Sequence, residues 1–335
     1  MQPLHHEPLA DYTTLKVGGP AAHLVAVQSV AELESMRQWA QSMGVPVLSL
    51  GSGSNVLIPD VGYPGLVIIN QIKGLVYEPA GGGAVTVTIG AGEQLDEVVA
   101  DSVSRGYWGL ENLSHIPGTV GAAPIQNVGA YGVELSALIE HVTAVSLSTG
   151  EVRVFANADC QFGYRDSYFK TTAGRDWFIT SVVCRLSTGR SPVLTYGDLQ
   201  QLDHHTCTLG AVRAHVIAIR STKFPDWHTV GTAGSFFKNP IISAAHCTQL
   251  QQQYSGLPAY KQADGQMKVS LGWILDKVCE LRGHQVGAVG LYQAQALVLI
   301  NTGDSAAAIA AFADQISQVV FTKTRITIEP EVRFV

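Results

Sequence analysis

One short segment of the sequence contains side chains that could bind a carboxylate. Residues 162–167 (Phe-Gly-Tyr-Arg-Asp-Ser) place Arg165 beside an acidic residue, with Tyr164 before it and Phe169 shortly after. An arginine with aromatic neighbours suits a partly desolvated site, where its planar fork can grip a carboxylate. Most adjacent arginine–aspartate pairs are instead surface ion pairs that contribute little. The segment therefore predicts an anion-binding arginine, with a surface pair as the alternative.

A second segment contains a hydroxyl group that could deliver a proton. Residues 234–240 (Gly-Ser-Phe-Phe-Lys-Asn-Pro) set Ser235 close to Lys238 and Asn239. A serine hydroxyl gives up a proton only to a strongly basic centre, and only where water is excluded. On this fragment alone, a turn serine beside two core phenylalanines is the favoured interpretation. The segment lacks the Gly-x-Ser-x-Gly pattern of acyl-transfer nucleophiles.

The last residues of the chain alternate charged and apolar side chains. Residues 328–334 read Ile-Glu-Pro-Glu-Val-Arg-Phe. In a strand, Glu329, Glu331 and Arg333 would share one face. Such charges can protect the edge of a sheet, or they can form one wall of an active site.

Two stretches of small residues could hold a phosphate and a flat ring. Residues 51–55 (Gly-Ser-Gly-Ser-Asn) follow an apolar run at 45–50 that predicts a buried strand, and such a turn lets backbone N–H groups converge on an anion. They match neither the P-loop nor the dinucleotide fingerprint, and an ordinary tight turn is the alternative. Residues 117–132 have few bulky or charged side chains, so their backbone could approach a heteroaromatic ligand. A tightly packed core crossing is the alternative there.

Composition argues against several classes of protein. The 335 residues carry a formal net charge of -6 without a Lys/Arg block, which argues against a general nucleic-acid binder. The five cysteines show no C-x-x-C pair and the 11 histidines show no metal-binding spacing, so reduced thiols and no metal are expected. Neither a signal peptide nor an apolar run of membrane-spanning length is evident. A cytoplasmic protein without a membrane partner is expected.

Apolar periodicity predicts mixed helices and strands around these segments. A capping box at Ser29 opens a helix whose apolar stripe ends at Met43, and Gly44 stops it. Strands are expected at residues 84–89, 142–147, 152–155, 296–300 and 325–329. Helical spacing is found at residues 95–103, 271–278 and 309–319. After about residue 220 the pattern changes to helices that alternate with strands, which indicates a smaller α/β module. Its boundary is placed approximately at residues 223–226.

Taken in order, segments along nearly the whole chain resemble the UDP-N-acetylenolpyruvoylglucosamine reductases, the flavoenzymes of bacterial peptidoglycan precursor synthesis. Each segment is weak alone, but seven in the same order are specific. The matching segments are residues 15–19, 51–57, 111–132, 163–167, 194–198, 234–240 and 329–334. Residues 258–265 further resemble the tyrosine-bearing loop of the family's first subtype, which closes over the substrate diphosphate.

The resemblance implies an α+β fold of the vanillyl-alcohol-oxidase/PCMH type that binds FAD non-covalently, with a separate α/β substrate-binding domain. The FAD-binding region is expected at residues 1–224, with subdomains of about 1–70 and 71–224 and a PCMH-type core of about 16–189. A C-terminal strand at 325–335 would complete it. The substrate-binding domain is expected at residues 225–324.

The resemblance also implies the reaction. NADPH would reduce FAD, and the enolpyruvyl ether of UDP-N-acetylglucosamine would then accept the hydride and become UDP-N-acetylmuramate. Charge developing on the substrate carboxylate would be met by Arg165, with Glu331 beside it, protonated or sharing a proton. Ser235 matches the proton donor to the adjacent carbon. A monomer that binds no nucleic acid is expected.

The remaining site residues are carried over from matching motifs. Those expected to bind the cofactor are Gly51, Ser52, Gly53, Ser54, Asn55, Val56, Pro117, Gly118, Thr119, Gly121, Ala122, Gln126, Asn127, Gly129, Ala130 and Arg333. Those expected to bind the UDP-sugar are Tyr164, Tyr196, Lys223, Lys238, Asn239, Tyr260 and Gln295. Among these, Lys223 and Tyr260 are the expected phosphate partners.

Two other functions are kept as alternatives. One is an FAD-dependent oxidase of the same fold acting on a sugar or a hydroxy acid. Such oxidases often tether FAD to histidine or cysteine. His115 is the only histidine in the loop that contains the second small-residue stretch, and it has no partner cysteine. The other is a catalytically silent protein that binds a nucleotide-sugar.

Overall fold

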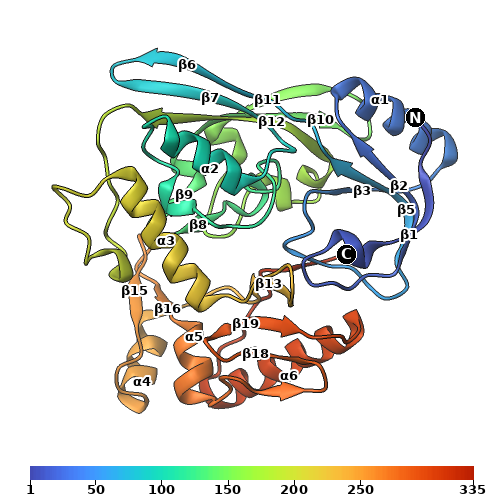
Figure 1. The fold of residues 1–335 in the computed structure, drawn as a ribbon. Coiled ribbons are helices and arrows are strands. Elements are labelled where there is room, and N and C mark those ends of the chain that lie inside the picture. Colours follow the sequence, from blue (N-terminus) through green and yellow to red (C-terminus); the bar gives the residue numbers. More distant parts are fainter. The chain divides into compact units, whose positions relative to one another are not determined.

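A computed structural model describes all residues from 1 to 335 (Figure 1). Internal contacts divide the chain into two compact units, each discontinuous in sequence. The N-terminal unit comprises Met1–Glu7, Ala21–Ser52 and Tyr63–Arg220, and the C-terminal unit comprises Pro8–Pro20, Gly53–Gly62 and Ser221–Val335. The domain division expected from the motifs stays a prediction.

The first sheet of the N-terminal unit has four strands in the order β1–β2–β5–β3. Strands β2 and β3 both pair with β5 in parallel, as expected for a sheet covered by a crossover helix. Its elements are β1 (Leu4–Pro8), β2 (Pro20–Val27), α1 (Val30–Met43), β3 (Val47–Leu50) and β5 (Tyr63–Asn70). The predicted helix is confirmed, because Ser29 Oγ accepts from the Glu32 N–H at 3.2 Å and Gly44 ends it with a φ of 66°.

The second sheet of this unit has five antiparallel strands in the order β11–β10–β12–β7–β6. They form one layer in Figure 1, with α2 against it. The elements are β6 (Leu75–Gly81), β7 (Ala84–Gly90), α2 (Leu95–Ser104), β10 (Ile139–Ser146), β11 (Val152–Ala156) and β12 (Trp177–Ser187). The predicted strand at 84–89 and the hairpin of β10 and β11 are confirmed.

The first 223 residues contain further elements, of which the 3₁₀ helix at Leu9–Tyr12 belongs to the C-terminal unit. They are β8 (Gly129–Ala130), β9 (Val133–Glu134), α3 (Leu209–Lys223) and the 3₁₀ helices Leu9–Tyr12, Glu111–Leu113, Pro124–Gln126, Leu135–Ala137, Asn157–Cys160, Tyr168–Lys170, Gly174–Asp176 and Gly197–Leu199. Helix α3 ends across the boundary, since its last three residues fall in the C-terminal unit.

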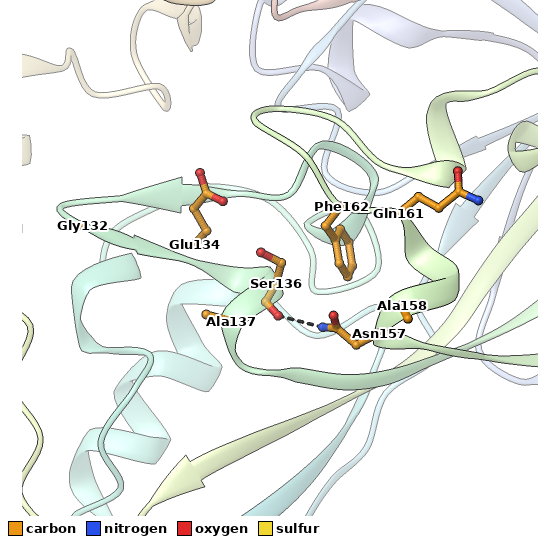
Figure 2. Close-up of a pocket in the computed structure, with 8 residues that line it drawn as sticks. All are labelled: Gly132, Glu134, Ser136, Ala137, Asn157, Ala158, Gln161 and Phe162. Carbon is orange, nitrogen blue, oxygen red and sulfur yellow. Dashed lines mark hydrogen bonds between the residues drawn. The ribbon is translucent and has the colours of Figure 1, made fainter. Parts of the chain in front are cut away.

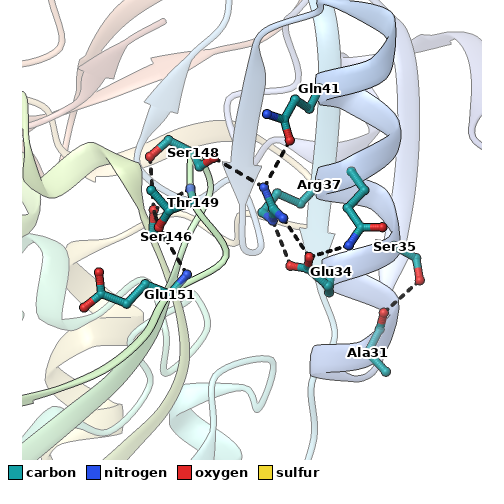
Figure 3. Close-up of polar contacts among 10 residues, drawn as sticks. Ala31, Glu34, Ser35, Arg37, Gln41, Ser146, Ser148, Thr149 and Glu151 are labelled. Carbon is teal, nitrogen blue, oxygen red and sulfur yellow. Dashed lines mark hydrogen bonds and ion pairs between the residues drawn. The ribbon is translucent and has the colours of Figure 1, made fainter.

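Arg37 of α1 hydrogen-bonds to the turn between β10 and β11 and forms an ion pair within its own helix, as Figure 3 shows. Arg37 donates to both carboxylate oxygens of Glu34 at 2.7 Å and to the Ser148 carbonyl at 3.3 Å. The hydrogen bonds from Arg37 lower the pKa of Glu34 to about 2. Arg37 is thus buried on the helix, whereas Met43, expected in the apolar stripe, is 54% exposed. The stripe prediction was wrong at Met43, because that last helical residue faces solvent.

The C-terminal unit contains two small antiparallel sheets and its own apolar core. One sheet has the order β13–β19–β18–β17 and the other β14–β16–β15. The strands are β13 (Gly231–Ser235), β14 (Ile241–Ile242), β15 (Ala259–Lys261), β16 (Met267–Val269), β17 (Gln285–Val286), β18 (Val289–Tyr292) and β19 (Gln295–Asn301). The helices are α4 (Ala244–Gln253), α5 (Leu271–Trp273) with a π-helical turn at Ile274–Val278, and α6 (Ala306–Thr324).

The predicted buried strand at 296–300 and the helical patterns at 271–278 and 309–319 are confirmed. The strand predicted at 325–329 was wrong. Arg325 ends α6 in the left-handed conformation, with a φ of 58°, and Ile326 and Ile328 pack in the core without a strand partner. Only β20 (Arg333–Phe334) forms a ladder, in parallel with β4 (Val56–Leu57).

Two early segments of the chain belong to the core of the C-terminal unit. The Thr232 N–H donates to the Thr14 carbonyl at 2.8 Å, and Asn301 Nδ2 donates to the Leu15 carbonyl at 3.2 Å. Asp60 accepts from the first backbone N–H groups of α6, at 2.9 Å from Ala306 and 3.0 Å from Ala307. A carboxylate in this position satisfies N–H groups that have no partner within the helix.

No helix in the chain combines the length and the apolar character that a membrane crossing requires.

Candidate active site

Only glycine fits at the carboxyl end of β3, because the Thr119 side chain packs directly against the backbone there. A Cβ on Gly51 would lie 2.4 Å from Thr119 Oγ1, which is far closer than atoms can approach. The Thr119 side chain is 4% exposed and its hydroxyl has no hydrogen-bond partner within the protein. Because buried hydroxyl groups are normally satisfied, this one is placed to bind a polar atom of a ligand. A glycine turn packed against an unsatisfied hydroxyl fits the binding of a polar group of a cofactor.

The backbone next to Thr119 is held by hydrogen bonds to the segment before α2. The N–H of Leu95 donates to the Gly118 carbonyl at 2.9 Å, and the N–H of Gly121 donates to the Ala91 carbonyl at 2.8 Å. Gly118 has a φ of 120°, and a Cβ on Gly121 would lie 2.6 Å from that of Ala91. Glycine is therefore required at both positions, as expected for a backbone that approaches a ring closely.

The other half of the predicted phosphate turn, residues 53–56, belongs to the C-terminal unit. Gly53 has a φ of 60°, and a Cβ there would lie 2.0 Å from the Tyr12 carbonyl oxygen, so chain packing alone requires this glycine. Asn55 Nδ2 donates to the Glu331 carbonyl at 3.1 Å, and Val56 pairs with Arg333. These residues join the turn to the C-terminal segment.

Asp96 fixes the start of the small-residue loop. It accepts from Arg213 at 2.6 and 3.1 Å and from the His115 N–H at 2.6 Å. Burial raises the pKa of Asp96, but the hydrogen bonds from Arg213 and His115 bring it below the ordinary value. No sequence pattern predicts this contact, because Asp96 and Arg213 lie 117 residues apart.

Arg165 lies against the loop that was predicted to hold the ring. Its guanidinium group donates to the Gly129 carbonyl at 2.7 Å and to the Asn127 carbonyl at 3.4 Å. The guanidinium carbon lies 5.7 Å from the centre of the Tyr164 ring. The predicted anion-binding arginine is thus held on backbone carbonyl groups, not in a surface pair with its neighbour Asp166.

In the C-terminal unit, the Ser235 and Glu331 segments run side by side. Ser235 ends β13, and the Glu331 N–H donates to the carbonyl of Phe236 at 2.8 Å. Two residues further on, the Lys238 N–H donates to the Glu329 carbonyl at 3.0 Å. The Lys238 ammonium group also lies 3.2 Å from a Glu329 carboxylate oxygen. A hydroxyl and a carboxyl group, far apart in sequence, therefore come from neighbouring segments.

Two of the predicted substrate tyrosines have defined neighbours. Tyr260 is 60% exposed and lies directly opposite Lys268 in the β15–β16 pair. The Tyr196 ring meets Tyr131 edge to face, with ring centres 5.2 Å apart. Burial raises the pKa of Tyr131 to about 12. Lys268 was not among the predicted site residues, because strands of three residues leave too little periodicity to predict a register. Tyr131 lies within the small-residue stretch at 117–132 but was not predicted as a site residue.

The other predicted substrate residues lie at the ends of elements. Asn239 Oδ1 accepts from the Leu271 N–H at 2.9 Å, and Gln295 Oε1 accepts from the Leu297 N–H at 3.4 Å. Lys223 is the last residue of α3. The C-terminal unit contains Ser235, Glu331, Arg333, Lys223, Lys238, Asn239, Tyr260 and Gln295, and the N-terminal unit contains Arg165, Tyr164 and Tyr196. Convergence of Arg165, Ser235 and Glu331 stays a prediction.

The chain contains no group of three or more His, Cys, Asp or Glu side chains that could hold a metal ion.

Comparison with known families gives two matches along the chain. Residues 21–156 match the model of an FAD binding domain. Residues 226–335 match the C-terminal domain of UDP-N-acetylenolpyruvoylglucosamine reductase. Gly51 and the unsatisfied Thr119 hydroxyl against which it packs both lie within the FAD-binding match, so the residues present fit this cofactor. The predicted fold class and the predicted FAD cofactor are confirmed.

Curated relatives cover almost the whole chain. The UDP-N-acetylenolpyruvoylglucosamine reductase of Salmonella typhi is 42% identical over 98% of this chain and 95% of its own length. The enzyme of the same name from Escherichia coli K12 is 43% identical over the same shares. The crystal structure of the Thermus caldophilus enzyme aligns with a TM-score of 0.69 and 25% identity, covering 100% of this chain and 99% of the other. This chain belongs to the UDP-N-acetylenolpyruvoylglucosamine reductase family.

Proposed function

We propose that this chain reduces UDP-N-acetyl-3-O-(1-carboxyvinyl)-glucosamine to UDP-N-acetylmuramate with NADPH and non-covalently bound FAD, a step of peptidoglycan precursor synthesis. The observation that carries this conclusion is the 42% identity to the Salmonella typhi reductase over 98% of the chain. FAD, when bound, takes a hydride from NADPH and gives it to the substrate. The chain supplies the binding, the charge and the proton.

The cofactor would be bound by the backbone at three glycines and by one hydroxyl group. In this proposal the turn at Gly51 packs against Thr119 beside the phosphates and the Thr119 hydroxyl binds one of the cofactor's polar atoms. Gly118 and Gly121 let the backbone approach the ring. The other predicted cofactor residues stand as proposals on the same motifs, with Asn127 treated separately below.

Arg165 would stabilise the charge that forms on the substrate carboxylate when hydride reaches the terminal carbon. A fixed cation lowers such a barrier most effectively when it is already oriented before the reaction begins. Two backbone carbonyl groups, those of Asn127 and Gly129, orient this guanidinium. The arginine fork therefore needs little rearrangement when the substrate binds.

Ser235 would deliver the proton to the neighbouring carbon, and Glu331 would act beside it. The hydrogen bond from the Glu331 N–H to the Phe236 carbonyl supports this pairing, because it fixes the two segments side by side. A serine can serve here because the carbon centre it protonates is far more basic than an alkoxide. Lys238 and Asn239, on the same segment, would polarise the hydroxyl.

The diphosphate would bind at the β15–β16 hairpin, and Tyr196 would contact the UDP-sugar. Tyr260 and Lys268 present a hydroxyl and an ammonium group on one face of that sheet. Lys223 and Gln295 are proposed as further contacts, and Tyr164 as a neighbour of the carboxylate site. The tyrosine loop assigns the chain to the family's first subtype in this proposal.

The proposed enzyme acts as a monomer in the cytoplasm. All five cysteines are free and buried, as is usual where thiols are kept reduced. The monomer follows from the motifs alone and is tested by sedimentation of the purified protein.

An anaerobic titration tests the function. NADPH should bleach the flavin absorbance, and the enolpyruvyl substrate should restore it with formation of UDP-N-acetylmuramate. A sugar or hydroxy acid that bleaches the flavin, followed by recovery with oxygen and release of peroxide, would instead identify the oxidase. Protein that binds the UDP-sugar but never carries flavin would be the silent binding protein.

A further inference from the structure

Arg165 occupies a backbone conformation that its own residue type disfavours. Its φ is 53°, in the left-handed region that side chains other than glycine, asparagine and aspartate rarely adopt. The residue lies in a tight turn in which Gly163 and Asp166 exchange backbone hydrogen bonds at 3.0 and 3.2 Å. Lys170 Nζ also donates to the Arg165 carbonyl at 2.6 Å. Such a conformation persists only when its surroundings hold it.

The side chain of Asn127 is one of the groups that hold this turn. Asn127 is 1% exposed, and its Nδ2 donates to the Gly163 carbonyl at 3.0 Å and to Glu134 Oε2 at 3.0 Å. Its Oδ1 accepts from the Ser136 N–H at 3.0 Å. Because a backbone N–H can only donate, this last bond fixes which end of the amide is oxygen. Both N–H donors of the amide are therefore used within the protein.

The backbone of Asn127 contacts the same arginine from its other end. Arg165 Nη1 donates to the Asn127 carbonyl at 3.4 Å, next to the 2.7 Å bond from Nη2 to the Gly129 carbonyl. One residue thus binds the turn through its side chain and the guanidinium group through its main chain. Asn127 itself has a φ of 44°, which asparagine tolerates better than most residues.

The outer side of this arrangement opens into a pocket of about 560 Å³. Glu134 and Ser136 line it with Asn157 and Phe162, and Asn157 donates to the Ser136 carbonyl at 2.8 Å (Figure 2). Glu134 is exposed, so solvent reaches the carboxylate that orients the buried amide. The contact from Glu134 through Asn127 to Gly163 therefore connects a surface residue with the Arg165 turn.

We propose that Asn127 is a positioning residue for Arg165 and that its side chain does not bind the cofactor. The amide, oriented by Glu134 and Ser136, fixes the turn at 163–166 and with it the direction of the guanidinium group. This inference rests on the proposed function, in which Arg165 stabilises charge on the substrate carboxylate. It replaces the expectation that the Asn127 side chain contacts FAD.

The first test is Asn127→Gly, which keeps a left-handed backbone accessible and removes the three side-chain hydrogen bonds. We expect the affinity of the apoprotein for FAD and the rate of flavin reduction by NADPH to stay within about twofold of wild type. Flavin reoxidation by the enolpyruvyl substrate should slow about 10- to 100-fold, the size expected when a catalytic group is misplaced by about 1 Å. Loss of FAD affinity would overturn the proposal, as would equal slowing of both half-reactions.

Gln161→Gly is the matched control. Gln161 lines the same pocket, has a φ of 47°, and is exposed. The substitution makes the same backbone change without removing a side chain from the contacts around Arg165. Both half-reactions should keep their wild-type rates, and a slowing equal to that of Asn127→Gly would attribute the effect to backbone flexibility and overturn the proposal.

A double-mutant cycle with Arg165→Ala tests whether Asn127 acts through the arginine. If it does, Asn127→Gly should slow reoxidation no further in the Arg165→Ala background. Additive losses would show an independent role and contradict the proposal. Should Asn127→Gly fail to fold, Glu134→Ala tests the same contact from the surface, with Glu134→Gln, which keeps the oxygen acceptor, restoring most of the rate.

These outcomes separate the inference from the proposed function. If the wild-type flavin is not reoxidised by the enolpyruvyl substrate, the function is wrong. If wild type is reoxidised but Asn127→Gly is reoxidised equally fast, only the positioning role is wrong.

Discussion

Tyr260 and Lys268 face each other across the β15–β16 pair as direct register partners. Directly opposed residues place their side chains on the same face, about 5 Å apart at Cβ. A phenol and an ammonium group are therefore presented together on a hairpin whose tyrosine is largely exposed. The sequence alone did not predict that these two residues are partners. Together they form the best candidate for the diphosphate site.

Lys268→Met and Tyr260→Phe should each raise the KM for the UDP-sugar about tenfold, since each removes one hydrogen bond to a charged phosphate. Reduction of the flavin by NADPH should not change. Lys261→Met is the control, because Lys261 neighbours Tyr260 on the same strand and its side chain points to the opposite face. Steady-state kinetics with both substrates provide the measurement, and an unchanged KM in both variants would remove the hairpin from the site.

Ser235→Ala should leave flavin reduction by NADPH near normal, because no proton from serine is needed there. Reoxidation by the enolpyruvyl substrate should fall about 10²- to 10⁴-fold, the usual contribution of a positioned proton donor. Anaerobic stopped-flow absorbance measures both steps. Ser243→Ala, which removes a helix-capping serine from α4, is the control for the loss of a hydroxyl elsewhere in the unit. Equal slowing of both steps by Ser235→Ala would contradict the assignment.

Thr119→Val should separate cofactor binding from stability. The hydroxyl is buried without a protein partner, so its replacement by a methyl group should leave the apoprotein as stable as wild type or about 1 kcal/mol more stable. The affinity for FAD should fall, because the substitution removes the hydroxyl that is proposed to hydrogen-bond to the cofactor. Thermal melts with and without FAD test both statements, and an apoprotein destabilised by the substitution would show that the hydroxyl serves the fold instead.

Gly51→Ala should weaken FAD binding more severely, since the new Cβ would meet Thr119 Oγ1 at 2.4 Å. The threonine or the turn must then move into the space proposed for the cofactor. Gly210→Ala, in α3, is the control, because a Cβ there meets no atom within 4 Å. Fluorescence titration of the apoprotein with FAD gives the affinity, and normal binding by Gly51→Ala would place the phosphates elsewhere.

Stability should fall as the solution becomes acidic below about pH 6.5, owing to His23. Burial and the neighbouring His5 and His6 lower the pKa of His23 from 6.5. Its neutral form is therefore favoured in the folded state, and the stabilisation is complete above pH 6.5 and is lost as the pH falls toward the lowered value. His23→Phe keeps a ring against Trp39, whose centre lies 4.9 Å away, and should flatten this dependence in melting temperatures taken across the range. An equally steep acid decline in the variant would assign it to other groups.

Capping residues and apolar periodicity predicted the elements whose ends depend on residues close by in the sequence. The capping serine, the glutamate three residues later and the terminal glycine define α1 within the helix itself. The predicted family and reaction class are confirmed by the comparisons, since each rested on several motifs in a fixed order.

Contacts between segments that are distant in the chain could not be predicted from the sequence. The strand expected at 325–329 had correct alternation, with Ile326 and Ile328 both buried. A neighbouring backbone contacts it through the hydrogen bond from the Lys238 N–H to the Glu329 carbonyl, but no ladder forms. The left-handed turn at Arg165 likewise depends on Asn127, 36 residues from Gly163. Residue types indicated the chemistry, whereas the geometry depends on partners that only the fold supplies.

The hydrogen bonds that join Thr14 to Thr232 and Asp60 to α6 have a consequence for biosynthesis. Both early segments leave the ribosome long before their hydrogen-bond partners are synthesised. They can fold only after more than two hundred further residues have been made. Loops of this length close slowly and favour late, cooperative maturation. A polypeptide started at residue 221 would lack these segments, and we expect it to require them in trans before it becomes protease-resistant.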